Sequence, residues 1–182
     1  MNREQLEHVL RASAAITGEN SFVLIGSQAV LLALADPDPL LTRSSEIDLY
    51  PAMAPEKADA IDEAIGALSQ FHDEFGYHAD GVSPETAVMP ADWMQRASFH
   101  YFGEARDIAA VCPELHDLCV SKCVAGRDKD ADFVRVLMQG GHVPVDRLRR
   151  RIGQLDAGKY PVKSIEAWAQ RRHLEAQGSA PP

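Results

Sequence analysis

Two short features of the sequence limit the folds open to this chain: a Gly-Ser pair that follows one apolar run, and two acids that lie inside a later apolar run. The first run, FVLI, precedes Gly26 and Ser27, and the second, EIDLY, carries Glu46 and Asp48. Because residues two apart on a strand face the same side, the acids project together while the apolar residues enter the core. Burying an unpaired carboxylate costs several kcal/mol, so these acids either point to solvent or meet a cation.

The Gly-Ser pair and the two acids complement each other chemically. Two carboxylates on one strand face repel each other unless a divalent cation lies between them, and Mg²⁺ or Mn²⁺ accepts such oxygen ligands. A turn that opens a helix over 28–35 would present backbone N–H groups and a positive helix end, which hold phosphate. Gly26 lets the backbone approach a ligand, and Ser27 can donate a hydroxyl hydrogen bond. The pattern predicts a site for a metal-bound NTP; a solvated strand face beside an ordinary tight turn is the alternative.

The pattern of apolar residues predicts both helices and strands in the first part of the chain and only helices in the second part. It predicts helices over 2–17, 28–35 and 55–68, strands near 22–25, 47–50, 75–82, 98–102 and 108–111, and then helices over 113–125, 129–138, 144–154 and 161–176. We therefore expect an α+β fold: a mixed β-sheet flanked by helices, followed by a C-terminal helical part. The expected domains are a core over 1–112, the helical part over 113–177 and a disordered tail over 178–182.

Charge and composition narrow the functional classes. The net charge of −9 argues against broad, nonspecific nucleic-acid binding. Residues 1–121 hold 6 Lys/Arg against 20 Asp/Glu, whereas residues 122–182 hold 12 against 7, so an acidic front precedes a basic back. No segment approaches the ~18 uninterrupted apolar residues of a membrane span, and the charged N-terminus does not resemble a signal peptide. With three cysteines that form no disulfide framework, we expect a cytoplasmic protein without a membrane partner.

The strand, Gly26-Ser27, helix and Glu46-x-Asp48 strand together resemble the signature of a known fold. The chain resembles the nucleotidyltransferase fold of the DNA polymerase beta-like superfamily. Within it, the chain looks most like the toxin-type nucleotidyltransferases of prokaryotic abortive-infection and toxin–antitoxin systems, which follow the catalytic sheet with a helical part carrying Lys and Arg. This resemblance spans most of residues 20–140, and it implies that residues 1–112 are the catalytic core. Glu46 stands where an aspartate is usual.

The resemblance also implies a third carboxylate on a later strand. Asp80 is our candidate because it lies in the next extended segment, and Asp73 or Glu74 remain alternatives. By this resemblance Glu46 and Asp48 would hold the metal against the triphosphate, and Gly26-Ser27 would grip its β/γ end. The third carboxylate would place a second metal or deprotonate an acceptor hydroxyl, which attacks the α-phosphorus and expels pyrophosphate.

Three cations of the helical part are further candidates for binding nucleotide. Lys122 could counter phosphate charge, and Arg127 and Lys129, near a turn, could do the same. The alternative for Lys122 is exposure or an ion pair with Asp117 or Asp130. Asp130 in turn could orient Lys122 or Arg127, or cap the following helix, and we favour the cap.

One helix stripe carries residues that zinc can bind. His116, Cys119 and Cys123 share that stripe, but they lack a second ligand pair. We therefore interpret the two cysteines as small core residues.

These observations lead to three hypotheses. The first is a metal-dependent nucleotidyltransferase that transfers a nucleoside monophosphate from an NTP to an RNA or protein acceptor, with a toxin role and a cognate antitoxin protein as extensions of it. The second is a catalytically weak module of the same fold that binds nucleotide or regulates, which Glu46 and the unlocated third acid favour. The third is an interaction protein whose acids are simply solvated.

Overall fold

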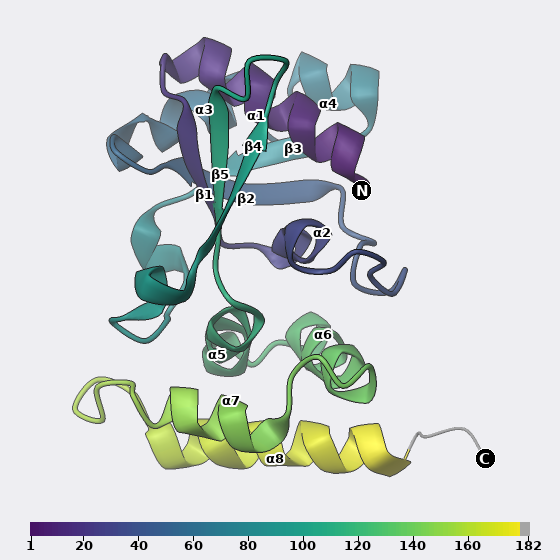
Figure 1. Ribbon diagram of the computed structural model, residues 1–182, viewed down its shortest axis with the longest axis vertical. Helices are drawn as coiled ribbons and strands as arrows, with labels where there is room; N and C mark the ends of the chain where they lie inside the picture. Colours follow the sequence, from purple (N-terminus) through teal and green to yellow (C-terminus); the bar gives the residue numbers. More distant parts are fainter. Residues whose placement is uncertain (179–182) are drawn as a thin grey trace. The chain divides into compact units, whose positions relative to one another are not determined.

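The computed structural model describes residues 1–178, which form two compact units (Figure 1). The first unit comprises Met1–Thr86 and Ala97–Pro113, and the second comprises Ala87–Arg96 and the described chain from Glu114 onward. The domain boundaries expected from the sequence stay a prediction. The expected disordered tail lies, beyond Gly178, outside the described residues.

A five-stranded mixed sheet forms the centre of the first unit, in the order β3-β2-β1-β5-β4. The pairs β1–β2 and β4–β5 are antiparallel, whereas β1–β5 and β2–β3 are parallel. The strands are β1 (Ser21–Leu24), β2 (Glu46–Pro51), β3 (His78–Gly81), β4 (Ser98–Phe102) and β5 (Ile108–Cys112). The α+β fold class expected from the sequence is confirmed.

Two helices, α1 (Arg3–Thr17) and α3 (Ala58–Ile65), contact each other and strands of this sheet. The side chain of Asn2 accepts a hydrogen bond from the backbone of Gln5 and the reverse bond is also formed, so a capping box starts α1. Gly18, at φ 71°, ends it. The apolar faces of the two helices are buried and belong to one core: Leu6, Val9, Leu10, Ala58, Ile61 and Ile65.

Two short helical segments of the first unit differ from the sequence expectation. The segment predicted as one helix over 28–35 is a 3₁₀ turn, Ser27–Ala29, followed by the four-residue α2 (Val30–Ala33). The sequence pattern did not reveal α4 (Gln70–Phe75), which Ser69 caps and Gly76 ends at φ 73°. Six residues span less than two helical turns, which is too short for apolar periodicity to stand out.

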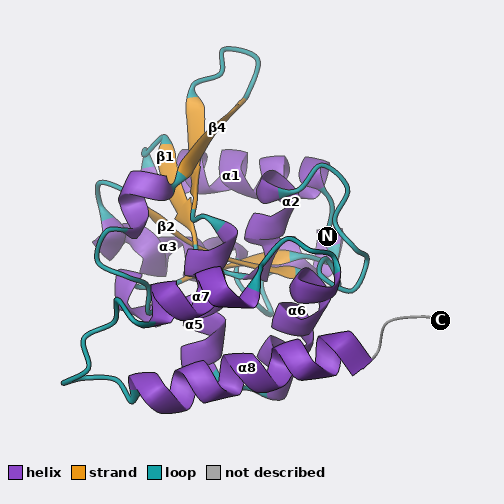
Figure 2. Cartoon of the chain, turned by 60° about the horizontal axis from the view of Figure 1, so that its bottom comes forward, coloured by secondary structure: helices purple, strands orange, loops and turns teal. Residues whose placement is uncertain are grey.

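The second unit is helical, as the pattern after residue 113 predicted. Its helices are α5 (Leu115–Ala125), α6 (Asp128–Gln139), α7 (Val145–Ile152) and α8 (Val162–Gly178). Figure 2 shows these helices in purple, with α8 as a long straight helix. Helices α5, α6 and α7 all contact α8, and the core between them is largely aliphatic: Leu118, Val134, Leu137, Leu148, Ile152 and Ala169.

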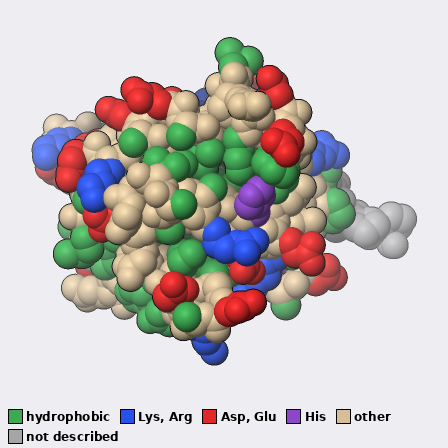
Figure 3. All heavy atoms as spheres, turned by 90° about the horizontal axis from the view of Figure 1, so that it is seen from above, with side chains coloured by type: hydrophobic (Ala, Val, Ile, Leu, Met, Phe, Trp, Pro, Cys, Tyr) green, Lys and Arg blue, Asp and Glu red, His purple; other side chains and the backbone are tan. Residues whose placement is uncertain are grey.

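The surface mixes charge and apolar area. On the face in Figure 3, acidic and basic side chains are interspersed with hydrophobic ones. No helix within residues 1–178 has the length and apolar character needed to cross a membrane.

Candidate metal and nucleotide site

Two adjacent parallel strands bring the candidate site residues together. In the register of β2 and β3, Glu46 lies opposite His78 and Asp48 lies opposite Asp80. Paired residues on neighbouring strands share a face, and residues two apart along a strand share it too, so all four side chains leave the same face of the sheet. The residues between them, such as Ile47 at 1% exposure, are buried on the other face.

Three of these side chains offer ligand atoms that lie close together. One atom each from Glu46, His78 and Asp80 lies within 4.8 Å of the other two. The Nε2 atom of His78 lies 3.2 Å from Oδ1 of Asp80. Because Mg²⁺ and Zn²⁺ bind protein ligands at ~2.0–2.2 Å, one ion can bridge atoms at these separations. Two carboxylates and an imidazole therefore form a donor set that fits a divalent ion.

Asp48 lies against the backbone of the Gly-Ser turn. A Cβ atom added to Gly26 would lie 1.9 Å from Oδ2 and 2.8 Å from Cγ of Asp48, so only glycine leaves room for this carboxylate. The strand pairing fixes the approach, because the backbone N–H of Ile25 donates to the carbonyl oxygen of Asp48 at 3.1 Å. The two halves of the sequence motif, separated along the chain, are thus neighbours in space.

The turn at Ser27 differs from the helix end that the sequence predicted. Ser27 begins a 3₁₀ turn and α2 has only four residues, so the dipole of a long helix does not stand behind this position. Gln28, in the same turn, is 1% exposed, and neither polar atom of its amide has a hydrogen-bond partner in the described chain. No signal in the sequence distinguishes this glutamine from a surface residue.

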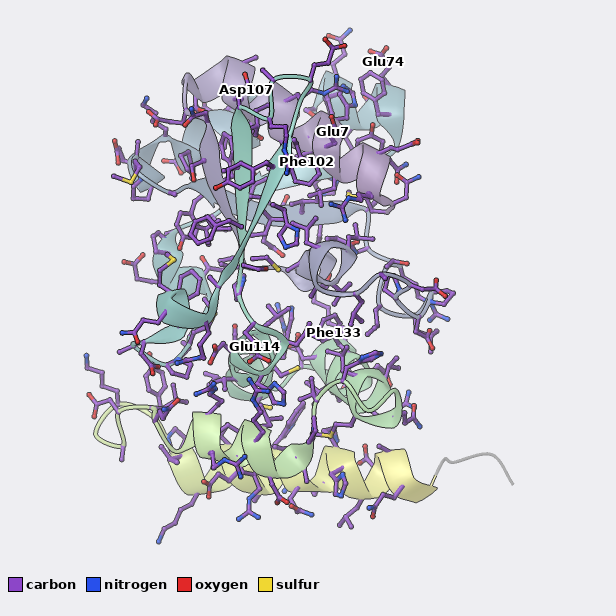
Figure 4. All side chains as sticks on the ribbon, in the orientation of Figure 1. Glu7, Glu74, Phe102, Asp107, Glu114 and Phe133 are labelled. Atoms are coloured by element: carbon purple, nitrogen blue, oxygen red, sulfur yellow. The ribbon has the colours of Figure 1, made fainter. Side chains whose placement is uncertain are left out.

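The candidates for the third carboxylate separate in the structure. Asp80 lies on β3 directly opposite Asp48. Asp73 and Glu74 lie on α4, where both side chains are exposed, and Figure 4 labels Glu74 there. The strand register therefore favours Asp80 over the two alternatives.

His78 is the site residue that sequence reasoning missed. It is 7% exposed, and its Nδ1 atom has no hydrogen-bond partner in the part of the chain that is described. The ring lies against that of His72, with centroids 4.5 Å apart and planes at 32°. The signal was a His-x-Asp spacing on β3 that repeats the Glu-x-Asp spacing on β2.

Two of the three basic candidates of the helical unit, Lys122 and Arg127, lie beside a buried acid. Asp130 is 1% exposed; Lys122 Nζ lies 3.5 Å from its Oδ1, and Arg127 Nε lies 2.7 Å from its Oδ2. Lys122 also lies over the ring of Phe133, which Figure 4 labels, at 5.5 Å. Of the two ion-pair partners considered for Lys122, Asp130 is the observed one.

Asp130 serves the helix start as well. Its Oδ2 accepts a hydrogen bond from the backbone N–H of Arg127, so the predicted cap of α6 is present. Burial raises the pKa of Asp130, but the hydrogen bond from Arg127 and the charges of Lys122 and Arg127 outweigh it, and the pKa lies below its ordinary value. Lys129 is exposed on the first turn of α6. The prediction that these cations bind nucleotide stays a prediction.

The possible zinc ligands of α5 are core residues. Burial raises the pKa of Cys119 well above its ordinary value and that of Cys123 to about 12, whereas zinc binds the thiolate. The Nδ1 atom of His116 is already 2.7 Å from Oε1 of Glu114. His116, Cys119 and Cys123 are all buried, so the prediction that the two cysteines are small core residues is confirmed.

Comparison with known proteins supplies the family. The chain matches, over residues 4–173, a family model described as "Nucleotidyltransferase of unknown function (DUF6036)". No curated protein and no solved structure matches the chain. The predicted resemblance to the nucleotidyltransferase fold is confirmed, and the narrower resemblance to toxin-type proteins stays a prediction. Because the match covers nearly the whole chain, the protein belongs to this family of nucleotidyltransferases of unknown function.

Proposed function

We propose that this protein is a metal-dependent nucleotidyltransferase that transfers a nucleoside monophosphate from an NTP to a hydroxyl of an RNA or protein acceptor. The observation that carries the proposal is the register of β2 and β3, which pairs Asp48 with Asp80 while Gly26 makes room for the Asp48 carboxylate. Facing acids that can hold a divalent ion, beside a backbone that can hold phosphate, would supply the positioning and charge stabilisation on which phosphoryl transfer depends.

Each candidate residue on the sheet and in the Gly-Ser turn has a part in the proposed reaction. Glu46, Asp48 and Asp80 would hold Mg²⁺ or Mn²⁺, which when bound neutralises charge developing on the phosphates. Gly26 and Ser27 would bind the β/γ-phosphates through backbone and hydroxyl donors. The acceptor oxygen forms a bond to the α-phosphorus, the bond from the α-phosphorus to the bridging oxygen breaks, and pyrophosphate leaves. The acceptor proton passes to the carboxylate of Asp80.

The proposal is tested by incubating the purified protein with each α-labelled NTP, Mg²⁺ or Mn²⁺, and either total cellular RNA or lysate protein. We expect label to enter one acceptor class, and Asp48→Ala to reduce this transfer by at least ~100-fold, because an interaction with charge in the transition state is lost. The matched control is Asp59→Ala, which removes an exposed acid of α3 in the same unit.

The remaining outcomes separate the competing hypotheses. Binding of a labelled NTP without transfer to any acceptor would favour the weak binding module. Absence of NTP binding, or transfer that survives Asp48→Ala, would refute the proposal. The toxin role has its own readout: expression of the protein should arrest growth of the host cell, and Asp48→Ala should relieve the arrest.

A further inference from the structure

We propose that His78 is a direct ligand of the ion held by Glu46 and Asp80, and that the site therefore prefers a first-row transition ion, such as Mn²⁺, over Mg²⁺. This inference rests on the proposed function only in taking this face of the sheet as the place of a divalent ion. It goes beyond it by adding a nitrogen ligand to a site that sequence reasoning assigned to carboxylates alone.

The sheet itself fixes the convergence of the three ligands. His78 lies opposite Glu46 in the register of two hydrogen-bonded strands, and Asp80 lies two residues further along β3 on the same face. Their ligand atoms already lie within 4.8 Å of one another. Since the Cα positions are held by the ladder, small rotations of the side chains suffice to close the three atoms around one ion.

His78 is buried, and only one of its two ring nitrogens faces an acid of the group. Its side chain is 9% exposed, Nε2 faces Asp80 at 3.2 Å, and Nδ1 has no hydrogen-bond partner within the described residues. A buried polar atom without a partner costs ~1–3 kcal/mol, so such an atom in a native protein calls for an explanation. A neutral imidazole always keeps one nitrogen lone pair, which is the group that a metal ion binds.

His72 supports the ring of His78 from one side. The two rings lie against each other at an angle of 32°, with centroids 4.5 Å apart. The Nδ1 atom of His72 accepts a hydrogen bond from the backbone N–H of Leu68 at 3.3 Å. His72 therefore packs against the proposed ligand and does not itself belong to the ligand group.

The ligand set decides the preferred ion. Mg²⁺ takes oxygen ligands almost exclusively, whereas imidazole suits the first-row transition ions. The competing arrangement is a protonated His78 that neutralises Glu46 and Asp80 in place of an ion. The two arrangements predict opposite results when Mn²⁺ is added to the protein without nucleotide.

The test measures ion binding directly, without any transfer reaction. The metal-stripped full-length protein is titrated with Mn²⁺, followed by electron paramagnetic resonance of the free ion, and with Mg²⁺, followed by calorimetry. We expect the wild type to bind Mn²⁺ at least ~10-fold more tightly than Mg²⁺, and His78→Gln to reduce this ratio by at least ~10-fold, because glutamine replaces the nitrogen by an oxygen. His142→Gln, which replaces an exposed histidine of the helical unit, should keep the ratio of the wild type.

A second measurement needs no variant and so does not depend on how well His78→Gln folds. In a histidine-labelled sample, the ¹⁵N resonances of the His78 ring should shift on addition of Zn²⁺, a diamagnetic ion, while those of the exposed His142 stay in place. A wild type without preference for Mn²⁺, an unchanged ratio in His78→Gln, or an unmoved His78 ring would each overturn the inference. Label transfer that depends on Asp48 and runs equally well with Mg²⁺ would then leave the proposed function standing.

Discussion

Carboxylates occupy contrasting environments in the helical unit and in the sheet. Asp117 of the helical unit is fully buried, and Arg96 holds it through two hydrogen bonds of 2.7 and 2.9 Å, with Arg151 Nε 3.6 Å away. Glu46 and Asp80 of the sheet are half-buried, and a histidine lies with them in one compact group. The helical acid is compensated by arginines of its own unit, whereas the sheet acids converge in a donor set that fits an ion.

The degree of burial distinguishes acids that stabilise the fold from acids that can bind a ligand. A fully buried carboxylate requires a permanent cation, because the cost of desolvation is otherwise too large. A half-buried carboxylate keeps part of its hydration and can exchange water for an ion or a substrate. Loss of a helical acid should therefore affect stability, and loss of a sheet acid should affect activity.

Asp117→Ala is expected to have the largest effect on stability. It removes the buried acid that Arg96 and Arg151 share and leaves Arg96 only its ion pair with the more exposed Asp92. The free energy of unfolding should therefore fall by ~3–5 kcal/mol. Urea unfolding followed by circular dichroism measures the change. The control is Asp132→Ala, which removes an exposed acid that pairs with Arg135 and should change stability by less than ~0.5 kcal/mol. Equal losses of stability in Asp117→Ala and Asp132→Ala would show that burial does not determine how much an acid stabilises the fold.

Gly26→Ala should produce a smaller loss of stability and a clear loss of function. The new Cβ would lie 1.9 Å from Oδ2 of Asp48, so the carboxylate must move away. We expect a cost of ~1–3 kcal/mol from overpacking and a fall in label transfer of at least ~10-fold from the displaced acid. Gly178→Ala is the control, because within the described residues no atom beyond its chain neighbours and its own helix backbone lies within 4 Å of the added Cβ. Full activity in Gly26→Ala would contradict the prediction that the reaction needs the close approach of Gly26 and Asp48.

Protonation of Asp130 at low pH should remove a stabilising interaction of the helical unit. Burial raises the pKa of Asp130, yet the hydrogen bond from Arg127 and the charges of Arg127 and Lys122 bring it below the value in the unfolded chain. Such a group stabilises the folded state above its unfolded pKa of ~3.9, and this stabilisation is lost as the pH falls through the folded pKa. The stability difference between the wild type and Asp130→Asn should therefore be constant from pH 7 to about 5 and shrink below about 4.

Urea unfolding of both proteins at pH 7, 5 and 3 measures this difference. Glu114 also affects the free energy of unfolding of each protein at low pH. Burial raises the pKa of Glu114, but the hydrogen bond from His116 and the charges of His116 and Arg147 outweigh this effect, so the pKa lies below its ordinary value. Glu114 titrates in both proteins alike, so its contribution cancels in the difference. A difference that stays constant down to pH 3 would contradict a depressed pKa of Asp130.

The sequence predicted the parts of the site that lie in regular strands. Period-two spacing placed Glu46 and Asp48 on one face, and the same rule applied to Asp80 once β3 was recognised as a strand. The contact of Gly26 with Asp48 and the burial of His78 escaped prediction, because strand register and packing depend on residues far apart in the chain. Local propensity does not contain that information.

The helical unit shows the same limit. The sequence predicted the helices there well, because three of them, α5, α6 and α8, have 11 to 17 residues and so span about three turns or more. Lys122 illustrates what they could not reveal. Its burial over Phe133 and its ion pair with Asp130 arise from the packing of α5 against α6 and leave no mark in local spacing.

Lys129→Ala is expected to have the smallest effect, and it asks whether cations of the helical unit serve nucleotide binding at all. Lys129 is exposed, so a contribution to binding phosphate charge is screened by solvent and worth ~0.2–1 kcal/mol. The KM for the NTP should rise about two- to fivefold, with kcat and the urea midpoint unchanged, in steady-state label transfer. Lys159→Ala removes another exposed lysine of the same unit and should leave the KM in place. Identical KM values for the two variants would confine the proposed chemistry to the sheet and leave Lys129 without a part in it.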